Sequence, residues 1–84
     1  MTWMPIAWAM LDDEVSVRIH EAESLDWADG GDDMGLIVAA NAEGIDVATG
    51  RGVLRIHRLQ WPGGRILTAA EANAGHQLLA RQFG

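Results

Sequence analysis

The sequence predicts a single small all-β domain that curls into a barrel and carries one short helix. Short apolar runs are separated by turns rich in glycine, which is typical of an antiparallel sheet. The apolar alternation changes phase within residues 53–61, and a signal for a helix start occurs at Thr68. A chain of 84 residues is long enough for one domain with one small core.

The first predicted strand covers residues 15–20, VSVRIH, where apolar and polar side chains alternate. This period of two is typical of a half-buried strand. The stretch 26–35, DWADGGDDMG, contains two adjacent glycines and four aspartates. We expect a solvated loop there, because such a composition does not pack into a core.

Three further strands are predicted to form a meander. Residues 36–40, LIVAA, form a short apolar run that predicts a strand buried on both faces. A tight turn at 41–44 leads into an alternating strand at 45–49. The sequence GRG at 50–52 then predicts a hairpin loop, with glycines available for positive φ, before the strand at 53–61.

The last strand of the meander contains a change of phase. The apolar residues Leu54 and Ile56 occupy even positions, whereas Leu59 and Trp61 occupy odd positions, so the two pairs would face opposite sides of a regular strand. A change of phase within one strand predicts a β-bulge or a strong bend, which small barrels use to close. Pro62-Gly63-Gly64 ends the strand, because proline cannot donate to a central ladder.

The helix signal follows this turn. Thr68 with Glu71 three residues later is a capping box, and Gly75 is a natural residue to follow a helix. A helix that begins after Thr68 and ends before Gly75 has fewer than two turns, so it must pack against the sheet to be stable. Four or five strands with one short helix predict a small open barrel of the oligonucleotide/oligosaccharide-binding type, or an SH3-like barrel.

Charge is distributed unevenly along the chain. The net charge is −6, yet residues 1–50 carry eleven acidic residues and one arginine, whereas residues 51–84 carry five arginines and one acidic residue. Such an asymmetry predicts a one-sided binding face, unless the fold mixes the two halves. The chain contains no lysine, although phosphate contacts need basic side chains.

Nothing in the sequence predicts a membrane or secreted location. The first eleven residues are apolar but short, and they lack the basic region of a signal peptide. The chain contains no cysteine and therefore no disulfide framework. We expect a cytoplasmic protein with no membrane partner.

The sequence offers only weak signals for catalytic or metal-binding residues. His20, His57 and His76 lack the spacing of metal ligands, and we interpret them as surface residues. The Asp-rich loop lacks the register of a calcium loop. We predict no catalytic residue, no metal and no cofactor in this chain.

Four tryptophans in 84 residues are many for a small domain. Trp3, Trp8, Trp27 and Trp61 could stack on bases, as aromatic residues do in proteins that bind single strands. We favour instead that they fill the core, because the predicted helix offers only small side chains. Trp61 in particular is predicted to be structural, since it follows the strand with the changed phase.

Several segments resemble the C-terminal domain of the methionyl-tRNA formyltransferase family. The matching segments are Gly44-Ile45, Gly52 to Gln60, Pro62 to Arg65, Thr68 to Glu71 with Gly75, and Phe83-Gly84. The resemblance covers essentially the whole chain, residues 1–84, as one domain, and it is specific from Gly44 to Gly75. Two departures are the absence of lysine and the pair Ala72-Asn73, where the family has bulky side chains.

The resemblance implies an open barrel of the oligonucleotide-binding type. In the family, this domain follows a catalytic domain that carries the formyl-donor site, and it helps to hold the tRNA largely through backbone contacts. Related formyltransferases that act on sugar nucleotides or peptide-synthetase substrates carry a similar domain without binding tRNA. The resemblance therefore implies a non-catalytic accessory domain that positions a tRNA or carrier-bound substrate.

The predicted binding face depends on one strand pairing. If the first and fourth predicted strands pair, Arg18 and His20 would stand beside Arg55 and His57, with the acidic residues elsewhere. The candidate residues for contact with nucleic acid or a partner are Arg18, Arg51, Arg55, Arg58 and Arg65. The alternative is a module that docks on a formyltransferase catalytic domain, on another protein or on itself, without RNA binding; the charge of −6 favours it.

The absence of a formyl-donor site gives a first prediction. The purified chain should show no formyl transfer from 10-formyltetrahydrofolate to any acceptor. A turnover assay with the chain alone checks this, and turnover above the uncatalysed rate would contradict it.

Overall fold

The structure is a computed structural model that describes the backbone of residues 2–3 and 7–84 and the side chains from Trp8 onward. Strands dominate the described residues, and one short helix follows them. The elements are β1 (Thr2–Trp3), β2 (Ala7–Leu11), β3 (Val15–Leu25), β4 (Ile37–Asn41), β5 (Gly44–Ala48), β6 (Val53–Gln60), β7 (Ile66–Thr68) and α1 (Ala69–Gly75).

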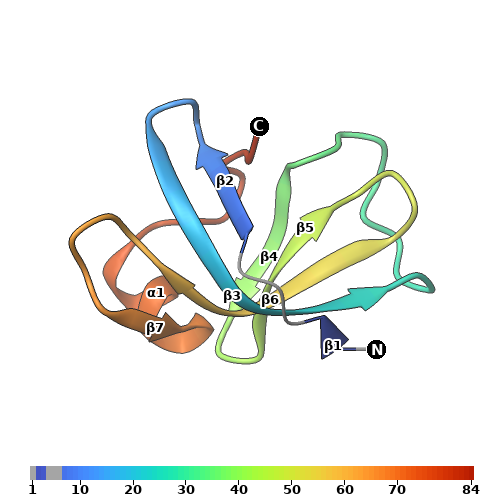
Figure 1. Cartoon of the computed structure of the whole chain (residues 1–84). Coiled ribbons are helices and arrows are strands. Elements are labelled where there is room, and N and C mark those ends of the chain that lie inside the picture. The colour runs from blue at the N-terminus through green and yellow to red at the C-terminus, as the bar shows by residue number, and fades with distance from the viewer. Residues whose placement is uncertain (1, 4–6) are drawn as a thin grey trace.

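The strands form one antiparallel sheet that curls into an open barrel (Figure 1). The order is β1-β3-β6-β5-β4, with β2 also paired to β3 and β7 to β6. The predicted all-β barrel with one helix is confirmed, and so is the meander, which is β4-β5-β6. The predicted pairing of the first and fourth strands is also confirmed, because β3 pairs with β6.

A pair of bulges bends β3 and β6 together. Ile19 faces Leu59 and Ala22 faces Ile56, but the register shifts twice between these pairs. One residue on each strand, His20 on β3 and His57 on β6, has no partner in register. Since side chains alternate with a period of two, the extra residue lets apolar side chains three positions apart both face the core. The bulge predicted in β6 is therefore confirmed, and its counterpart in β3 was not predicted.

The core lies inside the curl of the sheet. Leu11, Val17, Ile45, Ile56 and Leu59 are fully buried there. The run 36–40 was predicted to be buried on both faces, and this is wrong: Ile37 is buried, whereas its neighbours are only half-buried. The position of β4 explains the difference, because it is the last strand in the order of the sheet and is covered less than a central strand.

The helix α1 begins as predicted. The Thr68 hydroxyl accepts a hydrogen bond from the Glu71 backbone N–H, and the Glu71 carboxylate accepts one from the Thr68 N–H. Only two small side chains, Ala69 and Ala72, are buried on its inner face. The role predicted for Gly75 is wrong, because Gly75 is the last helical residue and His76 is the C-cap.

The C-terminal segment, residues 76–84 after α1, runs into the gap between β2 and β4. On one side, the Ile37 N–H donates to the Arg81 carbonyl and the Phe83 N–H donates to the Gly35 carbonyl, both at 2.8 Å. On the other side, the Gly84 N–H donates to the Met10 carbonyl at 2.8 Å. The sheet itself is open, but this segment connects its two edges through main-chain hydrogen bonds, which satisfy polar groups that an exposed edge would leave unpaired.

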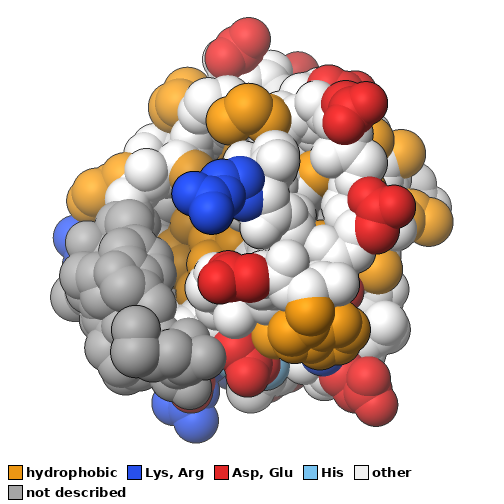
Figure 2. Space-filling model, turned by 90° about the vertical axis from the view of Figure 1, so that its right-hand side faces the viewer, with side chains coloured by type: hydrophobic (Ala, Val, Ile, Leu, Met, Phe, Trp, Pro, Cys, Tyr) orange, Lys and Arg blue, Asp and Glu red, His pale blue; other side chains and the backbone are white. Residues whose placement is uncertain are grey.

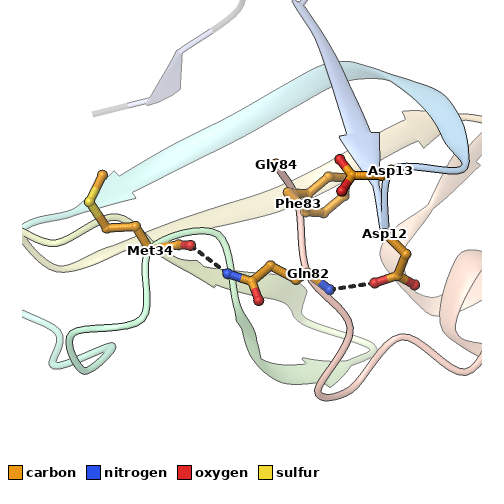
Figure 3. A pocket seen from close by; sticks show the side chains of 6 residues that line it. All are labelled: Asp12, Asp13, Met34, Gln82, Phe83 and Gly84. Carbon is orange, nitrogen blue, oxygen red and sulfur yellow. Dashed lines mark hydrogen bonds between the residues drawn. The ribbon is translucent and has the colours of Figure 1, made fainter.

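Gly35 and Asp12 adapt the barrel to this segment. Gly35 has a φ of 89°, and a Cβ at this position would collide with the Phe83 carbonyl, so only glycine fits. The Asp12 carboxylate accepts hydrogen bonds from the Arg81 Nε at 2.6 Å and from the Gln82 backbone N–H at 3.0 Å. Figure 3 shows the hydrogen bond between Gln82 and Asp12, and the Gln82 side chain donating to the Met34 carbonyl.

Truncating Phe83 should destabilise the whole domain. Its ring is only 8% exposed and belongs to the core, so Phe83→Ala should lower the free energy of unfolding by about 3–5 kcal/mol. Leu79→Ala is the matched control in the same segment, because Leu79 is 63% exposed and should cost less than about 0.5 kcal/mol. Urea unfolding measures both, and equal midpoints for the two variants would contradict the role of Phe83 in the core.

The hydrogen bonds to Asp12 should make the free energy of unfolding depend on pH in the acidic range. The hydrogen bonds from Arg81 and Gln82 hold the pKa of the Asp12 carboxyl below its usual value. The Asp12 carboxylate therefore contributes fully to the free energy of unfolding above its pKa in the unfolded chain, about 4. This contribution is lost as the pH falls through its pKa in the folded protein. Asp12→Asn should be less stable than the parent at pH 7, and the difference should shrink below about pH 4. Urea midpoints at pH 7 and pH 3 test this; a constant difference would contradict it.

Candidate nucleic-acid interface

The outward-facing side chains of the β3–β6 pair form the surface predicted from the sequence. We call this surface the β3–β6 outer face; its residues are Arg18, His20, Glu21, Glu23, Arg55, His57, Arg58 and Gln60. The predicted basic residues are present, but glutamates from β3 alternate with them. The expected separation of acidic from basic side chains is therefore wrong.

Arg55 is held by the sheet. Its guanidinium donates to both carboxylate oxygens of Asp46 on β5, at 2.7 and 3.0 Å. Its aliphatic stem lies against Gly44, where any Cβ would collide with it. The Asp46 carboxylate raises the pKa of the guanidinium above its usual value. A partly buried bidentate pair of this kind stabilises the sheet and leaves little capacity for a ligand.

The other paired cations are more exposed. Arg58 lies 3.3 Å from Glu21 across the β3–β6 pair, and Arg65 lies 2.9 Å from Glu71 at the start of α1. The Arg58 and Arg65 side chains remain 59% and 70% exposed. Exposed pairs of this kind contribute little to stability and exchange easily with other anions. Figure 2 shows acidic and basic side chains intermixed on one face of the molecule.

Arg18 and Arg51 have no carboxylate within 4.0 Å among the described residues. The Arg18 guanidinium lies over the Trp8 ring, 4.4 Å from its centroid. Arg51 lies in the exposed β5–β6 loop and lines a shallow hollow with Ser24, Asp26 and Thr49. These two arginines keep their charge available for a partner.

The five candidate arginines do not form one cluster. Arg18 faces Gln60 at the end of β6, and Arg58 and Arg65 belong to the β6–β7 hairpin. Arg51 precedes the start of β6, so it lies on the order of 20 Å away from Arg58 along the strand. Arg18 and Arg58 therefore lie at one end of the β3–β6 outer face, and Arg65 lies in the β6–β7 turn that follows this end.

The histidines take part in local contacts. His20 Nε2 lies 2.9 Å from the Gln60 side-chain oxygen, and His57 Nε2 lies 3.3 Å from Glu23. The His76 ring stacks on Trp61 with a centroid distance of 4.0 Å. Within the described residues, no three His, Asp or Glu side chains are arranged to hold a metal ion.

The prediction that the tryptophans fill the core is wrong for two of them. Trp27 is 81% exposed and Trp8 is 56% exposed. Trp61 is half-buried and packs against the core, as predicted, whereas the side chain of Trp3 lies outside the described residues. Strand position gives the reason for Trp8: it lies opposite the outward-facing Arg18, so its ring faces outward too.

Comparison with known proteins identifies the family. The family model for the formyl transferase C-terminal domain matches residues 1–77. The chain belongs to this family. The resemblance predicted from residues 44–75 is therefore confirmed, and the described fold agrees with it.

Curated relatives match most of the chain. A methionyl-tRNA formyltransferase of Xylella fastidiosa (strain M12) is 47% identical over 78 residues, which are 92% of this chain and 25% of that protein. One from Stenotrophomonas maltophilia (strain K279a) is 49% identical over 67 residues, 80% of this chain and 21% of that protein. The chain thus spans about a quarter of the length of these relatives. In the described part of the chain, α1 is far too short to cross a membrane.

The contrast between Arg55 and Arg51 is testable. Arg55→Ala should lower the free energy of unfolding by about 1–2 kcal/mol, because it leaves the half-buried Asp46 without its partner. Arg51→Ala is the control and should change it by less than about 0.5 kcal/mol. Urea unfolding measures both, and an unchanged midpoint for Arg55→Ala would show that Arg55 is free to bind a ligand.

Proposed function

We propose that this chain is a non-catalytic accessory domain that helps a formyltransferase to hold a tRNA substrate in the cytoplasm. The family match over residues 1–77, with relatives named methionyl-tRNA formyltransferase, is the observation that carries the proposal.

The contact region we propose is the end of β6 with the β6–β7 hairpin. Arg18, Arg58 and Arg65 lie there, and the last two are largely exposed. A phosphate can replace an exposed carboxylate on a guanidinium, because both bind in the same bidentate geometry. Contacts of this type would fix the position of the RNA backbone without reading its sequence.

A protein-docking role is the second candidate. Large apolar side chains are exposed at several places, with Trp27 at 81%, Met34 at 65% and Leu79 at 63%. Such a surface could contact a formyltransferase catalytic domain or a second copy of the chain. Sedimentation of the chain at increasing concentration tests for self-association through this surface.

Binding of labelled tRNA tests the leading proposal. With about three phosphates engaged, log K should fall with log salt at a slope of roughly −3. Arg58→Gln/Arg65→Gln should weaken binding about tenfold or more at low salt and reduce the slope toward −1, because it removes two of the contacts.

A matched pair of single variants provides the control. Arg65→Gln and Arg51→Gln each remove one charge from an exposed loop, at opposite ends of β6. Only the first should reduce affinity and slope. The proposed contact region would be wrong if labelled tRNA does not bind at the lowest salt concentration, or if the two variants reduce the affinity for tRNA equally.

A further inference from the structure

A small hollow opens beside the arginines of the contact region. It has a volume of about 210 Å³ and lies where β2, β3 and the turn after β6 meet. Its lining contains two indole rings, one guanidinium and one amide. The residues are Trp8, Arg18, Gln60, Trp61, Pro62 and Gly63.

The guanidinium in this hollow is poised for a ligand. Arg18 has no carboxylate partner among the described residues, in contrast to Arg55 and Arg58. Its Nε is buried and makes no hydrogen bond there. A buried donor without a partner is costly, so the position of Arg18 calls for an explanation. The ring of Trp8 fixes the guanidinium plane in place.

The walls of the hollow are held rigidly. The Gln60 side-chain oxygen contacts His20, and its amide donates to the Gly64 carbonyl at 2.8 Å. The Trp61 ring is parallel to the His76 ring, with 1° between the planes. Both contacts fix the orientation of flat side chains, so a planar ligand would meet surfaces that are already ordered.

We propose that this hollow binds one unpaired nucleotide of an RNA, with its base stacked on the flat side chains and its phosphate or base edge bonded to Arg18. The chemistry favours a nucleotide because the lining combines aromatic faces with a cation, as in proteins that bind single strands. This inference rests on the proposed RNA binding and adds a base-stacking contact to its phosphate contacts.

Fluorescence titration of the whole chain with hexaadenylate tests the proposal. The experiment uses a Trp27→Phe background, because the exposed Trp27 would otherwise dominate the signal. Hexaadenylate should quench the remaining fluorescence, and Trp8→Ala should weaken its binding about tenfold. Trp8→Leu should have the same effect while keeping an apolar side chain, so that a loss of folding in one variant does not decide the result.

Three controls separate the base from the charge. Trp27→Ala in the native background should change affinity, measured by anisotropy of labelled hexaadenylate, by less than twofold. Arg18→Lys keeps the positive charge but loses the planar group that stacks. Its affinity for hexaadenylate should lie between those of the parent and Trp8→Ala. A phosphate chain of equal length without bases should compete weakly and without dependence on Trp8.

The outcomes distinguish this inference from the proposed function. Binding of tRNA that needs Arg65 but is unaffected by Trp8→Ala or Trp8→Leu would overturn the nucleotide site and leave the phosphate contacts standing. Absence of hexaadenylate binding at low salt would also overturn the site. If tRNA also fails to bind, the proposed function is contradicted as well.

Discussion

The pairing of β3 with β6 is the interaction on which the rest of the structure depends. β1 and β2 attach to β3, and β5 and β7 attach to β6, so most of the sheet is built on these two strands. The paired bulges at His20 and His57 bend both strands at the same place and turn Ile19, Ala22, Ile56 and Leu59 inward. Without that bend, one half of each strand would direct its apolar side chains into solvent.

The same bend determines the character of the outer surface. Turning apolar residues inward at two positions brings Arg18, Glu21 and Arg58 outward at neighbouring positions on the two strands. Opposite charges therefore face one another across the pair, and the strongly acidic first half of the chain is partly neutralised by the basic second half. Availability for a partner depends on exposure as well as on pairing: Arg18 and Arg51 lack a carboxylate within 4.0 Å among the described residues, and Arg58 and Arg65 are paired but largely exposed.

The C-terminal segment completes the barrel at the gap that the strands leave. Its main-chain hydrogen bonds to β2 and β4 satisfy both edges, and Phe83 adds apolar volume that the alanines of α1 do not supply. A small domain has a small margin of stability, so a core side chain contributed by the C-terminal segment has a large effect. The stability of the candidate interface thus depends on a segment that does not belong to it.

The sequence by itself determined the local features: the alternation of residues 15–20, the turn at Pro62-Gly63-Gly64, the capping box at Thr68, the bulge in β6 and the family. These are set by period, turn chemistry and short-range hydrogen bonds. The spacing of three between Ile19 and Ala22 was a signal for the second bulge. Tertiary structure alone decided which carboxylate lies beside Arg55, where the C-terminal segment docks, and that Trp8 faces outward against Arg18. The physical reason is that these contacts join residues far apart in the chain, and strand register, which fixes them, is a property of the assembled sheet.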